Sequence, residues 1–528
     1  MSSIFEKYLE TAEMTDPIKC VGRIIRVQGL LIESKGPQAI IGELCRIEIN
    51  DDSHQRSPEE ETESRHIQAE VVGLKNDIVQ LMAYGETDGL RIGCRVIASG
   101  SRLDVAVSKK LLGRILGPLG KPLDGKGDIE SPVRYPAMAS PPDPYSRPRI
   151  RDRISTGIRA IDGLLTAGRG QRLGIFAGSG RGKTTLLGMI ARHTNADVNV
   201  IALIGERGRE VNEFLVNDLG KEGLARSVVV VTPSNSPPLA RLRGAYVATA
   251  VAEYFRDQGL DVMFLLDSVT RIARAQREIG LASGEPAATR GYPPSMFDSM
   301  PKLLERSGTS EKGTITGFYS ILVDGDDLDE PVSDTVRGIL DGHIILSQDL
   351  AQRYHYPAID VLKSISRVAD KITGPMTNRA VGIMRNYLAD YAGNEDLINV
   401  GAYKQGSNPR IDEAIAKHDD IEKFLIQGVN EKSSFTETLK AMAKITGVEI
   451  PDDELDVYAP KAPAMVLQTE DEEDSGEEAS PVEDDPKTEQ TDFMEYDAVL
   501  PLQEDLPPNE TFTASSPSDS PELPLIDL

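Results

Sequence analysis

The stretch LGIFAGSGRGKT at residues 173–184 decides the fold of the central part of this chain. An apolar run precedes a glycine-rich turn, and a helix-like segment begins at Lys183. A buried strand, a turn whose amide groups point inward and a helix N-terminus with partial positive charge together form a phosphate-binding loop. Gly178, Gly180 and Gly182 permit backbone angles that a Cβ atom would forbid. The stretch therefore predicts an α/β domain built around a P-loop.

The same loop predicts a nucleotide site that holds ATP and Mg²⁺. Lys183 can reach the terminal phosphates, and the hydroxyl of Thr184 can ligate Mg²⁺. Ala177 stands where glycine is commoner, which is tolerable because this residue ends the strand. The alternative is a turn that needs only flexibility, and the strand, the Lys-Thr pair and the helix argue against it. The residues predicted to bind nucleotide are Ala177, Gly178, Ser179, Gly180, Arg181, Gly182, Lys183, Thr184 and Thr185.

Composition bounds the rest of the chain. Its 528 residues suggest about three or four domains. Residues 451–528 hold 24 Asp/Glu and 2 Lys, so this segment carries −22 of the net charge of −26 and the body is nearly neutral. Neither part has the basic surplus that binding to a phosphate backbone needs, which argues against a nucleic-acid partner.

The cysteines and the hydropathy pattern indicate a cytoplasmic protein. The 3 cysteines form no disulfide framework and no metal-ligand spacing. The N-terminus lacks a basic region followed by an apolar core, and no run approaches the roughly 18 apolar residues of a membrane span. Any membrane contact is therefore expected to be peripheral.

The segments before the loop predict two units. Residues 1–17 predict a short amphipathic helix, which is either a docking helix for a partner or the membrane surface, or a frayed surface helix. Residues 18–101 show short alternating strands separated by turns and predict a small β-barrel, with a polar loop at residues 51–64. No basic, aromatic face that would bind RNA is visible in this barrel.

Residues 102–374 predict the P-loop ATPase domain. Apolar runs at residues 199–204, 227–232 and 262–266 alternate with helical segments, which implies a parallel sheet covered on both faces. One such helix is expected over residues 236–258, with Ser236 as its cap.

The C-terminal part predicts a helical domain at residues 375–450 and a disordered acidic tail at residues 451–528. The apolar stripes of the helical domain are expected to be core, although a binding face is the alternative. Apolar groups interrupt the tail at residues 493–502 and 523–528. These are either docking motifs or parts of a solvating tail.

Three residues outside the loop are candidates for the chemistry. Asp267 ends a buried strand, where its carboxylate can hold the Mg²⁺ water shell beside Thr184. Glu206 ends a neighbouring strand, where a carboxylate can polarise the attacking water. Arg367 has no obvious acidic partner near it in sequence. The alternatives are a helix cap for Asp267 and an ordinary ion pair for Arg367.

The chain resembles the export ATPases of bacterial flagella and type III secretion systems, which are themselves similar to the catalytic subunits of rotary ATP synthases. The resemblance spans about residues 1–450 and implies that the P-loop domain at residues 102–374 has a RecA-like fold. It rests on DRISTGIRAIDGLLTAGRGQRLGIFAGSGRGKTTLLGMIAR, GERGREV, VRGILDGHIILS, YPAIDVLKSISRV and NVGAYKQGSNPRIDEAI. Residues 394–415 look more flagellar than virulence-type.

The resemblance implies roles for further residues. Glu206 would orient water, Arg207 would lie near the phosphates, and Arg367 would act as an arginine finger in the next subunit's site. Tyr356 would pack on adenine, and Val429 takes the place of a second aromatic on that side. Arg181 stands where the family usually has a small apolar residue; we expect it to point to solvent, and added charge near the phosphates is the alternative.

The resemblance also implies the assembly and its partners. It predicts a homohexamer that couples ATP hydrolysis to protein unfolding and export at the cytoplasmic face of the inner membrane. Its expected partners are a regulator, a stalk protein, export substrates and their chaperones, and residues 291–308 resemble the loop that faces the central pore. The alternatives are a rotary or vacuolar-type catalytic subunit, a terminator-type RNA translocase, and an ATP-binding scaffold.

Overall fold

The first folded unit is a closed barrel of six antiparallel strands. The computed structural model describes residues 21–49, 65–323, 325 and 327–455, so the helix predicted at 1–17 and the loop predicted at 51–64 lie outside the described residues. The barrel order is β1-β2-β5-β4-β3-β6. Its strands are β1 (Val21–Gln28), β2 (Leu31–Lys35), β3 (Glu43–Glu48), β4 (His66–Lys75), β5 (Ile78–Ala83) and β6 (Arg95–Arg102).

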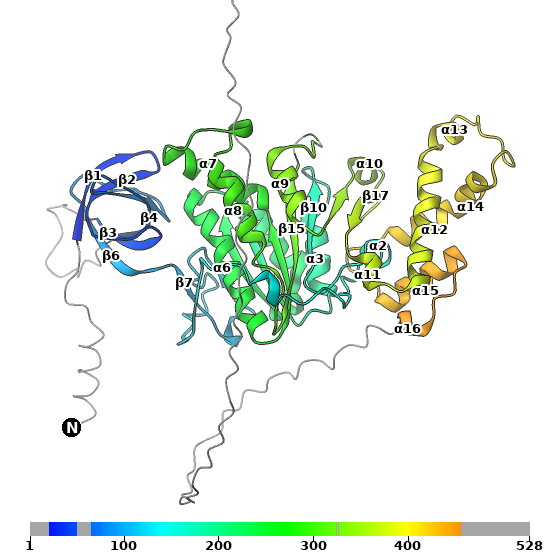
Figure 1. Ribbon diagram of the computed structural model, residues 1–528, viewed down its shortest axis with the longest axis horizontal. Coiled ribbons are helices and arrows are strands. Elements are labelled where there is room, and N and C mark those ends of the chain that lie inside the picture. Colours follow the sequence, from blue (N-terminus) through cyan, green and yellow to red (C-terminus); the bar gives the residue numbers. More distant parts are fainter. Residues whose placement is uncertain (1–20, 50–64, 324, 326, 456–528) are drawn as a thin grey trace, which may run out of the picture. The chain divides into compact units, whose positions relative to one another are not determined.

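Apolar side chains from alternate strand positions fill the interior of this barrel. Ile24, Ile32, Ile47, Leu81 and Val96 point inward and are almost fully buried, because successive side chains of a strand face opposite sides. Closure pairs each of the six described strands with a neighbour on both sides. The predicted small β-barrel is confirmed (Figure 1).

A buried ion pair joins the barrel to the central domain. The guanidinium of Arg243 binds the carboxylate of Glu70, which also accepts a hydrogen bond from the hydroxyl of Tyr84. The Glu70 side chain is 2% exposed and the Arg243 side chain 13%, so the buried carboxylate depends on the guanidinium for solvation.

The central domain is built on a mainly parallel sheet in the order β17-β16-β10-β15-β13-β11-β12-β8, with β14 paired to β15. β17 is the exception in the main path, because it runs antiparallel to β16. The strands are β8 (Ile115–Leu116), β10 (Arg172–Ala177), β11 (Val198–Glu206), β12 (Ser227–Pro233), β13 (Asp261–Asp267), β14 (Gly308–Thr309), β15 (Thr314–Leu322), β16 (Gly342–Leu346) and β17 (Ile359–Ser366).

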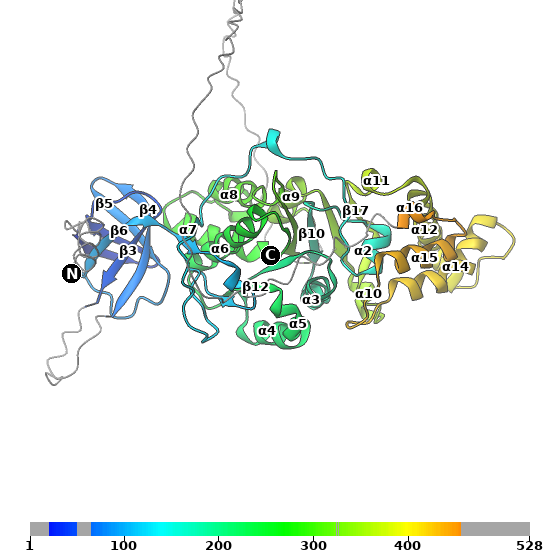
Figure 2. The same ribbon diagram turned by 90° about the horizontal axis from the view of Figure 1, so that it is seen from below.

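Helices cover both faces of this sheet, as the apolar strands predict (Figures 1 and 2). One buried core contains side chains of α6, α7, α8 and α9, and another contains side chains of α2 and α3. The helices are α2 (Arg159–Leu164), α3 (Lys183–His193), α4 (Gly208–Glu213), α5 (Gly220–Ala225), α6 (Pro238–Asp257), α7 (Val269–Ala282), α8 (Pro294–Leu304), α9 (Pro331–Ile339), α10 (Gln348–Gln352) and α11 (Ala369–Ile372).

Two local predictions in this domain need correction. The helix expected over 236–258 is α6, but Pro237 is its N-cap residue and no side chain caps it, so Ser236 does not have the predicted role. The stretch 291–308, expected as a loop, is mostly the helix α8. Met296 and Met300 bury completely against the core, which is why this segment is helical rather than open.

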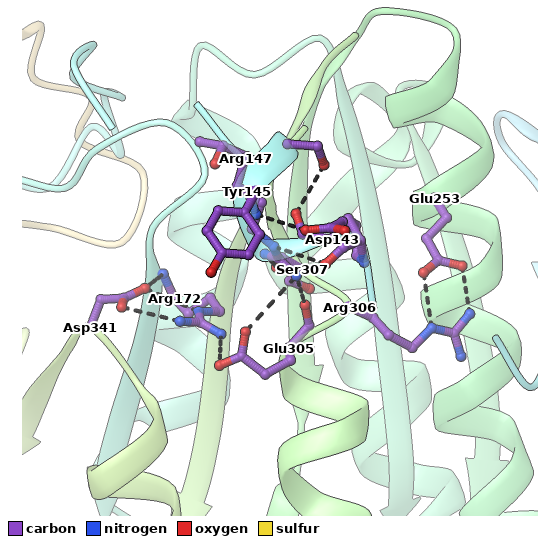
Figure 3. A network of polar contacts seen from close by, with 12 residues as sticks. Asp143, Tyr145, Arg147, Arg172, Glu253, Glu305, Arg306, Ser307 and Asp341 are labelled. Atoms are coloured by element: carbon purple, nitrogen blue, oxygen red, sulfur yellow. Dashed lines mark hydrogen bonds and ion pairs between the residues drawn. The ribbon is translucent and has the colours of Figure 1, made fainter. Parts of the chain in front are cut away.

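A connector strand pair, β7 (Asp104–Ala106) with β9 (Arg134–Pro136), precedes the sheet. The segment after β9 then contacts the central domain. Figure 3 shows Arg147 reaching the chain around Ser307, and its guanidinium donates to the Ser307 carbonyl oxygen over 2.8 Å. The neighbouring Arg306 forms a buried ion pair with Glu253, with 2.5 Å between the charged atoms.

The C-terminal described residues are helical. The helices are α12 (Pro375–Ala392), α13 (Glu395–Asn399), α14 (Pro409–Leu425), α15 (Phe435–Thr446) and α16 (Asp452–Leu455). Ile421 and Phe424 of α14 and Leu439 and Met442 of α15 are buried together, so the predicted stripes are core. Gly447 ends α15 in the left-handed conformation with φ 71°.

The boundary predicted for the disordered tail is wrong for α16. Glu454 is buried, and its carboxylate accepts hydrogen bonds from the amides of Met376 over 3.0 Å and Thr377 over 2.7 Å. These amides lie in the first turn of α12, where an acidic group satisfies free donors and opposes the helix dipole. The remainder of the predicted tail, residues 456–528, lies outside the described residues.

Within the described ranges, no helix is both long and apolar enough to cross a membrane.

Candidate active site

The phosphate loop joins the carboxyl end of β10 to the start of α3. Gly180 and Gly182 have φ values of 77° and 81°, which side chains with a Cβ rarely adopt. Gly182 is the N-cap residue of α3, so Lys183 and Thr184 form the first turn of the helix. The free amide groups of this turn and the helix dipole make an anion site, as the sequence predicts.

Asp267, at the end of β13, lies next to Thr184, so the two candidate metal ligands are neighbours. Its carboxylate is 1% exposed and lies 2.7 Å from the Lys183 ammonium. It also accepts hydrogen bonds from the hydroxyls of Thr184 over 3.3 Å and Ser320 over 2.6 Å. Ser320 was not predicted from the sequence; a hydroxyl in the middle of a buried apolar strand is the signal that could have identified it.

This donor set fits Mg²⁺ held partly by a nucleotide. A hydroxyl and a carboxylate are hard oxygen ligands, and Mg²⁺ usually takes only one or two protein ligands and fills its shell with phosphate oxygens and water. Among the described residues, no group of three or more His, Cys, Asp or Glu side chains could hold a metal ion without such help.

Glu206 ends β11, the strand beside β13. Burial and the negative charge of Asp267 raise the pKa of Glu206 to about 7, while Lys183 opposes this shift. A carboxyl with a pKa near neutrality can accept a proton from a water molecule and still be ionised at physiological pH. Arg207 follows at the start of α4, where its side chain is 77% exposed and pairs with Glu210 over 3.4 Å.

A cavity of about 480 Å³ adjoins the phosphate loop. The ring of Tyr356 forms part of it and lies over Gly182, because a Cβ atom on that glycine would be 3.6 Å from the ring. Val429 lines the cavity, and so does Tyr354, which no sequence pattern predicted. Its other lining residues are Gly180, Thr185, Leu186, Met189, Pro357, Ile426, Gln427 and Gly428. A largely apolar cavity of this size fits a nucleotide base.

The expected position of Arg181 is wrong. Its guanidinium turns toward the end of β16, where it donates to the carbonyl oxygen of Leu346 over 3.1 Å and to the side-chain oxygen of Gln348 over 3.0 Å. It also lies against Gly178, where a Cβ atom would approach it to 2.7 Å. The half-buried side chain therefore ties the phosphate loop to the end of β16 and the start of α10 and does not extend freely into solvent.

Arg367 lies at the opposite end of the strands from the phosphate loop of its own chain. Ala177, which starts the loop, pairs with Leu346, and Leu346 pairs with Ile359 at the start of β17. β17 then runs 8 residues away from the loop to Ser366, a length of roughly 26 Å at about 3.3 Å per residue. Arg367 follows directly, so the site residues at the loop are brought together without it.

Comparison with known proteins agrees with this arrangement. Residues 24–100 match the β-barrel domain of the ATP synthase alpha/beta family, residues 157–366 match its nucleotide-binding domain, and residues 373–444 match the T3SS EscN ATPase C-terminal domain. The flagellum-specific ATP synthase of Treponema pallidum is 54% identical over 444 residues, which cover 84% of this chain and 97% of that protein. The chain belongs to the flagellar and type III secretion ATPase family. The predicted resemblance is thereby confirmed.

Other members of this ATPase family show similar likeness. The flagellum-specific ATP synthase of Bacillus subtilis is 52% identical, covering 84% of this chain and 99% of that protein. The type 3 secretion system ATPase of Xanthomonas euvesicatoria is 48% identical, covering 80% and 94%. The solved structure of the assembled ATPase EscN from the enteropathogenic E. coli type III secretion system matches with a TM-score of 0.74 at 42% identity, over 80% of this chain and 100% of that one.

Proposed function

We propose that this member of the export ATPase family is the ATP-hydrolysing motor of a flagellar-type protein export apparatus and works as a homohexameric ring. Its likeness to two flagellum-specific relatives, at 54% and 52%, supports the flagellar assignment. The observation that supports the ring is the position of Arg367 at the end of the strands opposite to its own phosphate loop. A complete site then needs two copies of the chain.

Different residues around the loop bind the phosphates, Mg²⁺ and the base of the nucleotide. The loop amides and Lys183 hold the β- and γ-phosphates, and Thr184 and Asp267 would hold Mg²⁺. When bound, Mg²⁺ neutralises charge on the phosphate oxygens. Lys183 pairs with Asp267 over 2.7 Å in this structure, so an incoming triphosphate competes with the Asp267 carboxylate for the ammonium group. The apolar cavity under Tyr356 takes the base.

Glu206 and Arg367 carry the hydrolysis step. Glu206 orients the attacking water and accepts its proton as the bond to the γ-phosphorus forms and the bond to the leaving ADP oxygen breaks. Arg367 of a neighbouring copy offers its guanidinium to the charge that spreads over the transferred group. An arginine supplied in this way contributes about 10³ to 10⁵ in rate.

Mixed rings test whether the site is shared. Lys183→Ala removes the phosphate ligand but keeps the finger, and Arg367→Ala does the reverse, so each variant alone should retain about 1% of wild-type turnover or less. In random rings of equal parts, about one interface in four joins an intact loop to an intact finger. We therefore expect the mixture to regain about a quarter of wild-type ATPase activity if sites act independently.

The control is a mixture of Lys183→Ala with a Lys183→Ala, Arg367→Ala double variant, which contains no intact loop and should stay inactive. Ring formation is followed by light scattering in every mixture. If the two single variants assemble together and show no recovery, or if Arg367→Ala alone turns over normally, the shared site is refuted.

The partners and location follow from the same assignment. We propose that the ring binds a regulator, a central stalk, export substrates and their chaperones, and that it lies in the cytoplasm against the inner membrane. A solved structure of EscN in complex with its central stalk EscO, which matches with a TM-score of 0.73, supports the stalk. The match to the T3SS EscN ATPase C-terminal domain supports an export ATPase over a rotary catalytic subunit.

A further inference from the structure

Gln171 occupies a buried position beside the backbone of Arg367. Its side chain is completely buried just before β10 begins. Its amide nitrogen donates to the carbonyl oxygen of Asp341 over 3.1 Å and to the hydroxyl of Ser366 over 3.0 Å. Its amide oxygen accepts a hydrogen bond from the Gly168 amide over 2.9 Å, which sets the orientation of the side chain. One side chain thus joins the start of β10 to the residue before Arg367.

Asp341 is the second point that holds Arg367. Its carbonyl oxygen accepts from the Gln171 side chain and also from the backbone amide of Arg367, over 3.0 Å. Figure 3 shows its carboxylate facing Arg172, which donates from its backbone amide over 3.0 Å and from its guanidinium over 3.1 and 3.2 Å. Arg172 also pairs with Glu305 over 2.6 Å. The Asp341 carbonyl is therefore a fixed anchor.

Ser366 is held from a third side. Its hydroxyl accepts from Gln171 and donates to the carbonyl oxygen of Thr166 over 2.9 Å. By contrast, the Arg367 side chain is exposed, and its guanidinium donates to the carbonyl oxygen of Arg337 over a long 3.3 Å. The reach of the guanidinium into a neighbouring site is consequently set by where its backbone is held.

We propose that Gln171 is a positioning residue for the Arg367 finger. This inference rests on the proposed function, in which Arg367 acts in a neighbouring copy. Gln171 fixes the positions of Ser366 and the Asp341 carbonyl through its hydrogen bonds. The backbone of Arg367 is therefore held in place while its side chain extends into the neighbouring site. Because β10 runs from Arg172 to the phosphate loop at Ala177, a single strand connects the nucleotide of one copy to the finger that this copy offers to the next.

The size of the effect follows from geometry. Misplacing a catalytic group by about 1 Å can cost about 100-fold in rate. Replacing Gln171 by methionine keeps the approximate volume and removes the two donated hydrogen bonds together with the one accepted from the Gly168 amide. We expect Gln171→Met to lower kcat by about 10- to 100-fold and to change KM by less than about two-fold, since the loop that binds ATP is untouched.

A double-mutant cycle with Arg367→Ala tests the inference. If Gln171 acts through the finger, Gln171→Met should lower kcat in the wild-type background but change it by less than about two-fold when Arg367 is already alanine. Thr316→Val is the matched control, because Thr316 is equally buried and its hydroxyl accepts from the Gly170 amide over 2.9 Å without touching the finger. It should keep kcat near wild type.

Mixed rings supply a readout that a structural defect would not move. Gln171→Met has an intact phosphate loop, so an inactive Lys183→Ala partner with a well-placed finger should raise its turnover. Equal losses of kcat with and without Arg367, or no recovery in verified mixed rings, would overturn the inference. If Arg367→Ala itself leaves kcat unchanged, the proposed function fails instead, and the inference falls with it.

A second variant covers the case in which Gln171→Met does not fold. Ser366→Ala removes only the hydroxyl that Gln171 and Thr166 hold. Like Gln171→Met, Ser366→Ala should lower kcat, and it should cause no further loss of kcat when Arg367 is already alanine. Wild-type kcat for a folded, assembled Ser366→Ala ring would count against the positioning role.

Discussion

Glu206 has a half-buried carboxyl group, and its role as a base requires the ionised form. Burial and the charge of Asp267 raise its pKa to about 7, so its ionised fraction changes across the neutral range. As a base it is active above this pKa and inactive below it. We expect kcat/KM of the assembled ring to fall as pH is lowered from 8 to 6, approaching about ten-fold per pH unit below the pKa. Steady-state rates over this range, with ring formation checked at each pH, provide the measurement; a flat profile would contradict the role.

Replacing Glu206 by glutamine separates binding from turnover. Gln keeps the shape of the side chain but accepts no proton at this pH. We expect Glu206→Gln to lose about 10² to 10⁴ in kcat while it still binds ATP with an affinity close to that of wild type. Single-turnover hydrolysis and a nucleotide titration measure the two quantities. Equal turnover by Glu206→Gln and wild type would remove this residue from the mechanism.

The substitution Glu206→Gln lowers turnover, but we expect it to raise the stability of the folded chain. The pKa of Glu206 is raised from 4.5 to about 7 by folding, so the protonated form is favoured in the folded chain and the stability of the wild type falls as pH rises between these values. Gln does not titrate. We expect Glu206→Gln to raise the Tm of the nucleotide-free protein at pH 8 more than at pH 5. Equal shifts in Tm at both pH values would contradict this account.

At the scale of elements, Arg181 fastens the phosphate loop to the segment that carries the base-side tyrosines. Its two hydrogen bonds reach the end of β16 and the first residue of α10. Holding these parts together before nucleotide arrives lowers the ordering cost of binding. We expect Arg181→Val to weaken nucleotide binding by about ten-fold, which corresponds to about 1.4 kcal/mol, with kcat little changed.

A cycle with Gln348→Ala checks that the effect runs through this contact. Gln348→Ala should weaken binding by a smaller factor and should add little to Arg181→Val. Gly178→Ala should act in the same direction as Arg181→Val, because its methyl group would meet the guanidinium at 2.7 Å. Titration with a fluorescent ADP analogue measures all variants. Wild-type affinity for a correctly folded Arg181→Val would refute the role.

At the scale of the whole chain, α16 decides where a truncation can begin. Glu454 binds the first turn of α12, and its carbonyl oxygen accepts from the buried Arg153 over 2.9 Å. We expect a chain ending at Leu455 to keep the wild-type ATPase rate and Tm. A chain ending at Pro451 should have a lower Tm, because the hydrogen bond from Arg153 to the Glu454 carbonyl oxygen and the bonds from the α12 amides to the Glu454 carboxylate are removed. A large loss of ATPase rate in the chain that ends at Leu455 would give residues 456–528 a part in hydrolysis.

The sequence by itself determined the phosphate loop, the buried strands and the positions of Glu206 and Asp267 at strand ends. These features are local: a glycine-rich turn, an apolar run or a carboxylate after it can be recognised within about ten residues. Local patterns gave a wrong prediction for residues 291–308. Its prolines and glycines indicated a loop, but burial of its methionines against the core makes most of this stretch a helix.

The tertiary structure alone decided which groups meet across long stretches of chain. The direction of Arg181, the contact of Ser320 with Asp267 and the hold of Gln171 on the residue before Arg367 join groups 53 to 195 residues apart. The position of Arg367 depends on β17 running antiparallel to β16, which no local pattern shows. Hydrogen bonds form between whichever groups the packed strands bring within about 3 Å, and packing is a property of the complete chain.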